Sequence, residues 1–244
     1  TLLNRSFSKH FPVPVVLGIE EYLNGPLLNW VVEIGYPCLA FEAGSHHSPQ
    51  SIENAEAFIC LSMVFAQLTD KEQLPEYKRF TEILSNANHH HDTIFEIRYK
   101  REISDKDGFE MKSGYVNFQR IEKDEVLATD KNGELRAAES GRIFMPLYQS
   151  QGNDAYFRIR EIAPVWLKLS AWLRKVGFET LLTMLPGVNR DPNEHYTLVV
   201  NRRVARFLAT EIFHLLGYRN KKHTDKELRF SRREYDVRGI ARIQ

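Results

Sequence analysis

Hydrophobic periodicity changes twice along this chain of 244 residues and divides it into three regions. In the first region, residues 13–19 are an apolar run rich in β-branched side chains, which is typical of a buried strand, and a helical pattern follows at 27–34. Residues 38–41 (CLAF) indicate a second buried strand, and a second helical stripe covers 48–68. Alternating strands and helices predict part of an α/β domain with a mainly parallel sheet over 1–68.

The second region has the pattern of a separate domain of short strands. Residues 69–92 are polar, and we expect them to form a linker that contains a helix-like piece around 75–84. Residues 93–103 then alternate apolar and charged side chains, which is typical of a strand with one face in water. Further short apolar segments follow, separated by glycines and by a hairpin turn at 130–133. The sequence predicts a small antiparallel β barrel or sandwich over 93–162.

The third region, residues 163–244, has helical periodicity. A first amphipathic helix is expected from Pro164, and a second over 199–216, before a glycine that would end it. We therefore predict a C-terminal helical extension.

Charge and composition narrow the classes of function. The 33 basic and 32 acidic residues nearly cancel, and the excess of basic residues after position 157 is spread along amphipathic segments, so nucleic-acid binding is not indicated. No apolar run approaches the length of a membrane span. Two cysteines, Cys38 and Cys60, are too few for a disulfide scaffold, and a reducing cytoplasm is the simplest setting. The composition is also compatible with a homo-oligomer.

Glu42 is the candidate catalytic residue. Its carboxyl group comes just after the predicted strand and beside the small residues Ala43 and Gly44, where open α/β sheets form their ligand crevice. A carboxyl group in such a place suits proton transfer, although a surface or helix-capping role is the alternative. His46 follows on the same loop and could hydrogen-bond a substrate or cap the next helix.

A run of histidines, His89–His91, raises the question of a metal site, because histidine is a common metal ligand. Three consecutive histidines cannot all converge on one tetrahedral ion without a special turn, so a solvated loop is the better interpretation. The sequence contains no H-x-x-E, H-E-x-x-H, P-loop or G-x-S-x-G motif.

Two longer stretches resemble the succinylglutamate desuccinylase/aspartoacylase family of zinc-dependent hydrolases. They are residues 38–57 (CLAFEAGSHHSPQSIENAEA) and 113–157, which contains the block MPLYQSQG. The resemblance covers about 12–160 and implies a zinc-carboxypeptidase-like α/β domain followed by a smaller β domain.

The resemblance also implies roles for individual residues. Glu42 matches the family's catalytic glutamate, which acts as base toward zinc-bound water and then donates a proton to the leaving amine. Tyr156 lies where aspartoacylases have a tyrosine that contacts the substrate, and the substrate would be a small acylated amine or amino acid. The arginine that some members use to hold a substrate carboxylate has no counterpart in 24–41.

The family's zinc ligands, an H-x-x-E pair and a later histidine, have no match in this sequence. We therefore expect no zinc ligand in this chain, and we expect the chain to be the carboxyl-terminal part of a longer zinc hydrolase, inactive without the missing segment.

Two alternatives belong to other classes. Residues 126–143 also resemble the hairpin of lipoyl or biotinyl carrier domains, with Lys131 at the turn as the residue to be acylated. The β domain and the helical tail could instead form a non-catalytic binding or scaffold module.

Overall fold

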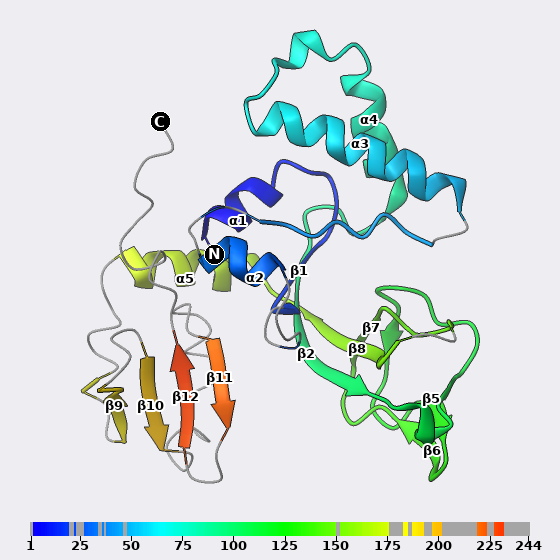
Figure 1. The fold of residues 1–244 in the computed structure, drawn as a ribbon, viewed down its shortest axis with the longest axis vertical. Helices are drawn as coiled ribbons and strands as arrows, with labels where there is room; N and C mark the ends of the chain where they lie inside the picture. Colours follow the sequence, from blue (N-terminus) through cyan, green and yellow to red (C-terminus); the bar gives the residue numbers. More distant parts are fainter. Residues whose placement is uncertain are drawn as a thin grey trace. The chain divides into compact units, whose positions relative to one another are not determined.

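The computed structural model (Figure 1) forms two compact units, which we treat separately. The β unit comprises Val15–Tyr22 and Thr93–Ile162, and the α/β unit comprises Thr1–Pro14, Leu23–Asp92 and Ala163–Gln244. The structure describes residues 2–19, 22, 27–33, 36, 38–45, 48–149, 152–175, 183–184, 187–192, 197–201, 219–223 and 227–231.

A mixed five-stranded sheet forms the larger part of the β unit. Its strand order is β1-β2-β8-β7-β4, in which β1 runs parallel to β2 and every other neighbouring pair is antiparallel. The strands are β1 (Val15–Leu17), β2 (Ile94–Glu102), β4 (Arg120–Ile121), β7 (Gly141–Phe144) and β8 (Asp154–Glu161). The strand predicted from the alternation at 93–103 is therefore confirmed as β2.

A second, three-stranded antiparallel sheet has the order β3-β5-β6. Its strands are β3 (Glu110–Met111), β5 (Val126–Asp130) and β6 (Gly133–Arg136), and a short 3-10 helix, η3 (Asp105–Asp107), precedes them. The predicted hairpin turn is confirmed, because Asp130 pairs with Gly133 and leaves two residues in the loop. Gly133 has φ +112°, a conformation that favours glycine.

Side chains from both sheets of the β unit meet in one core cluster, to which Leu127 contributes from β5 and Ile143 from β7. A second cluster forms around Phe95, Phe157 and Ile159, and partly buried side chains at and after β1 pack against it. Both sheets are open in the described part of the chain, so no closed barrel forms there. The two-residue strands β3 and β4 are too short to extend the ladders toward closure.

In the α/β unit, helices α3 and α4 pack on each other. The helices before residue 93 are α1 (Leu2–Ser8), α2 (Leu27–Glu33), α3 (Pro49–Phe65), the 3-10 helix η2 (Lys71–Gln73) and α4 (Tyr77–Ala87). Helix α3 begins where the helical stripe at 48–68 predicts it, with Ser48 as N-cap and a proline in its first turn. Leu61 from α3 and Leu84 from α4 are fully buried in one apolar cluster. The segment predicted as a linker thus contributes a helix to a core, since α4 has an apolar face that α3 covers.

The predicted parallel sheet over 1–68 is not present in the described part of the α/β unit. The run at 13–19 supplies β1, which pairs with β2 in the β unit. Residues 38–41 are irregular, and Leu39 and Phe41 pack against the α3–α4 cluster. A short apolar run can bury its side chains against a helix as well as in a sheet, and its periodicity does not distinguish the two.

The described part of the C-terminal region contains a sheet as well as a helix, which corrects the prediction of a helical extension. Helix α5 (Pro164–Lys175) begins at Pro164 as expected. It is followed by an antiparallel sheet of order β11-β12-β10-β9, built from β9 (Val188–Arg190), β10 (Thr197–Asn201), β11 (Arg219–His223) and β12 (Glu227–Ser231). Strand β10 buries Leu198 and Val200 and contains three β-branched residues, which favour a strand at the start of the segment that the periodicity predicts as a helix. The rest of the helix predicted to 216 lies outside the described residues.

Among the helices that the structure describes, none combines the length and the apolar character that crossing a membrane requires.

Candidate functional site: the Glu42 loop and the β5–β6 hairpin

Glu42 lies on the irregular segment before α3, and the residues on either side of it contact that helix. The ring of Phe41 stacks on the ring of Phe58 in α3, with centroids 4.1 Å apart and planes inclined by 2°. On the other side, Asn54 Nδ2 donates a hydrogen bond of 2.9 Å to the carbonyl oxygen of Ala43. Asn54 is itself buried, so this bond forms where water does not compete freely. The two contacts hold the backbone of Glu42 in place.

A third contact between the loop and α3 involves Ser45. Ser51 Oγ, from the first turn of α3, donates a hydrogen bond of 2.7 Å to the carbonyl oxygen of Ser45. Gly44 passes close to the same hydroxyl, with φ +129°. The side chain of Glu42 itself is exposed. The loop therefore presents an accessible carboxylate from a fixed backbone, and its anchors Ser51 and Asn54 look like ordinary helix residues in the sequence.

Replacement of Gly44 by alanine tests how tightly the Glu42 loop is held. A Cβ at Gly44 would lie 2.6 Å from Ser51 Oγ, and φ +129° is strained for any L side chain. We expect Gly44→Ala to lower the free energy of unfolding by about 1–3 kcal/mol, measured by urea denaturation. Gly108→Ala is the control, because Gly108 also has positive φ but no atom lies within 4 Å of its added Cβ. Equal losses in the two variants would show that the contact with Ser51 does not hold the loop.

The other two candidate residues are His46 and Tyr156. His46 lies outside the described residues. Tyr156 is in β8 of the β unit, only 5% exposed, and burial raises the pKa of its hydroxyl. Because Glu42 and Tyr156 belong to different units, neither unit alone contains two of the described candidates. The substrate contacts expected for His46 and Tyr156 stay predictions.

The residues that the structure describes do not offer a metal site. Among them, no three His, Cys, Asp or Glu side chains are arranged so that they could hold an ion. Within the histidine run, His91 Nδ1 lies 3.1 Å from the carbonyl oxygen of Pro12, and His89 is exposed. The described residues therefore do not fit the zinc that the family resemblance implies.

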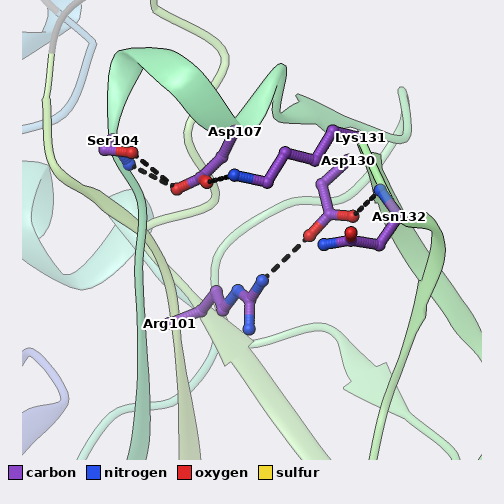
Figure 2. A network of polar contacts seen from close by, with 6 residues as sticks. All are labelled: Arg101, Ser104, Asp107, Asp130, Lys131 and Asn132. Carbon is purple, nitrogen blue, oxygen red and sulfur yellow. Dashed lines mark hydrogen bonds and ion pairs between the residues drawn. The ribbon is translucent and has the colours of Figure 1, made fainter.

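Lys131, the residue that a carrier domain would acylate, lies at the β5–β6 turn and forms an ion pair (Figure 2). Its Nζ is 2.9 Å from Asp107 Oδ1, and the other oxygen of Asp107 accepts hydrogen bonds from the backbone N and the Oγ of Ser104 at 2.8 and 2.9 Å. At the same hairpin, Arg101 pairs with Asp130 at 3.0 Å. Lys131 Nζ would have to leave Asp107 before it could be acylated, so the ion pair does not favour the carrier interpretation.

The pKa of Asp107 reports on this ion pair. The hydrogen bonds from Lys131 and Ser104 lower the pKa of Asp107 from an ordinary value of 3.8 to about 2. We expect Lys131→Gln to raise that pKa partway back, as followed by NMR titration of the carboxyl carbon. Because the folded-state pKa is the lower one, the stabilisation from Asp107 is complete above about pH 4 and is lost as the pH falls toward 2. Lys123→Gln, an exposed lysine in the same unit, should leave the pKa unchanged. An unshifted Asp107 pKa in Lys131→Gln would contradict the pairing.

Comparison with known proteins gives little beyond this geometry. No protein-family model and no curated protein matches the sequence. One similar solved structure is the succinylglutamate desuccinylase of Vibrio parahaemolyticus, with 16% identity and a TM-score of 0.26. The match covers 39% of this chain and 30% of that one, so the chain spans under a third of the length of its neighbour. A TM-score this low supports no argument about fold or activity, and the assignment must come from the residues.

Proposed function

We propose that this chain is part of a hydrolase that cleaves a linear amide or ester in a small acylated amine or amino acid, with Glu42 as the acid/base. The observation that carries the proposal is the exposed Glu42 carboxylate, whose two neighbours in the chain both contact α3, Phe41 through its ring and Ala43 through its carbonyl oxygen. A catalytic carboxylate must be open to substrate and also fixed in position. The resemblance of residues 38–57 to deacylases points to the same side chain.

The chemistry assigned to Glu42 is a proton shuttle. The carboxylate accepts a proton from water as the water oxygen attacks the carbonyl carbon of the substrate. The same proton then passes to the leaving nitrogen, or oxygen in an ester, as the bond from the carbonyl carbon breaks. The carboxylate is regenerated, and no oxidant or reductant takes part.

Other components of the proposal come from the family resemblance alone. Zinc would be held by residues outside those described, and it would polarise the substrate carbonyl. His46 and Tyr156 would contact the substrate. A cytoplasmic setting, with no nucleic-acid or membrane partner, completes the proposal.

The proposal is tested with the complete natural protein and a panel of N-acylated amino acids and matched esters. The panel varies the acyl group, from acetyl to succinyl, and the amine separately. We expect release of free amine or alcohol for one acyl class, detected by a fluorogenic amine reagent or by chromatography, and loss of release after treatment with a zinc chelator. Absence of release from every member of the panel would contradict the proposal.

A second candidate, a non-catalytic binding module, is favoured by one observation on α3. Ile52, Ile59 and Met63 lie on one side of the helix and are 74%, 60% and 38% exposed. Exposed apolar side chains on one helix face are typical of a surface that another chain covers, including a second copy of the same chain. This candidate predicts no turnover on any substrate. Light scattering of the purified protein would show whether a homo-oligomer covers the face.

A further inference from the structure

The β unit contains a small cavity between its two sheets. Its volume is about 100 Å³. The residues that line it include Tyr99, Ile121, Leu127, Tyr156 and Arg158. They come from strands of both the five-stranded and the three-stranded sheet. Binding of a ligand in this cavity needs no hydrolytic activity, although Tyr156 is also the residue that the proposed function places against the substrate.

Arg158 provides a cation at the cavity that is nearly buried but only partly paired. Its side chain is 12% exposed, and its Nη2 lies 2.7 Å from Oε2 of Glu139, whose side chain is 73% exposed. The guanidinium carbon lies 5.9 Å from the centre of the Tyr99 ring, which adds a weak cation–π contact. A guanidinium carries five N–H donors, and one carboxylate uses at most two of them in a bidentate pair. Donors of Arg158 therefore remain for a second anion.

Tyr156 supplies a second polar group to the same cavity. The residue is 5% exposed, and its ring centroid lies 6.2 Å from that of Tyr99. Within the described part of the chain its hydroxyl makes no hydrogen bond to another group of the protein. A hydroxyl without a protein partner, on a side chain that lines the same cavity as a guanidinium, is suited to a ligand that accepts hydrogen bonds.

Apolar side chains form most of the remaining wall, which also contains Arg136, and they favour a ligand with a short apolar chain. Ile121 and Leu127 line the cavity and are 1% and 0% exposed. A dry apolar cavity of about 150 Å³ is large enough for benzene, so this smaller space suits a chain of a few carbons. We propose that the cavity binds a short aliphatic carboxylate, with its oxygens on Arg158 and the Tyr156 hydroxyl and its alkyl chain against Ile121 and Leu127.

Titration calorimetry with sodium butyrate tests the site, and 1-butanol serves as the uncharged analogue. We expect saturable butyrate binding with a Kd of about 1 mM, because so small a ligand buries few atoms. Arg158→Met keeps the length of the side chain and should weaken binding by about tenfold or more, since it removes charged hydrogen bonds. Tyr156→Phe keeps the ring and should weaken binding about fivefold. Butanol should bind much more weakly than butyrate.

Arg120→Met is the matched control, because Arg120 is an exposed arginine of the same unit that does not line the cavity. This variant should bind butyrate as the unaltered protein does. Unfolding midpoints of all variants show whether the β unit stays folded, and Tyr156→Phe remains informative if Arg158→Met unfolds. Absence of saturable binding, equal binding of butanol, or unchanged butyrate affinity in Tyr156→Phe and in folded Arg158→Met would each overturn the proposal.

Discussion

Replacing Glu42 by glutamine in the complete natural protein is expected to lower kcat for amide hydrolysis by about 100- to 10,000-fold. Glutamine keeps the size of the side chain but cannot accept a proton from water. The contacts that hold the loop use the Phe41 ring and the Ala43 carbonyl oxygen, and neither involves the side chain of Glu42. The variant should therefore fold normally, with an unchanged unfolding midpoint, and KM should change much less than kcat.

The control for this result is Glu56→Gln. Glu56 is an exposed carboxylate on α3, so its replacement makes the same change in charge near the loop. Turnover in this variant should stay within about twofold of the unaltered protein, in line with the small effects of most surface substitutions. Near-normal turnover in Glu42→Gln, or equal losses in both variants, would remove Glu42 as the acid/base and leave the binding-module interpretation.

Phe95→Ala is expected to lower the free energy of unfolding of the β unit by about 3–5 kcal/mol. Phe95 in β2 is fully buried, and its ring lies 5.1 Å from the ring of Phe118. Truncation removes apolar contacts and leaves a cavity that the paired strands on either side of β2 cannot readily close. The measurement is urea denaturation followed by the fluorescence or circular dichroism of the isolated chain.

Val116→Ala provides the comparison for this stability prediction. Val116 is in the same unit but is 64% exposed, so its truncation should change the free energy of unfolding by about 0.5 kcal/mol or less. If Phe95→Ala cost no more than Val116→Ala, the cluster around Phe95 would not be a packed core. The same pair of variants would also show whether the two compact units unfold in one transition or in two.

Local features were the most predictable part of the fold. The hairpin at 130–133, the start of α3 after Ser48 and the start of α5 at Pro164 all appear as expected. Each depends on side chains within a few residues of the feature, such as a proline in a first helical turn or a glycine with positive φ. Such signals do not depend on what the rest of the chain does.

Pairing between distant segments was much less predictable. The apolar run at 13–19 was placed in an α/β sheet, whereas β1 pairs with β2, which lies about 80 residues later in the chain. Residues 38–41 looked like a strand of the same sheet but pack on α3 and α4 instead. Apolar periodicity indicates that a segment is buried, but it does not identify the segment that it pairs with or packs against.

For the candidate site, the carboxylate could be chosen from residues 38–57, but the contacts that hold its loop could not. Asn54 and Ser51 act through single hydrogen bonds to backbone carbonyls, and such bonds leave no pattern in a sequence. The cavity with Arg158 and Tyr156 was even less predictable from the sequence, because its lining comes from strands of two different sheets.

The amino-acid sequence was enough to locate turns, helix starts, an alternating strand and an acidic residue in a loop, because these follow from the conformational preferences of neighbouring residues. Sheet partners, the anchoring of Glu42 and the lining of the β-unit cavity came from the folded chain. They depend on side chains that are far apart in the sequence and meet only when apolar surfaces pack, and that packing is a property of the whole fold.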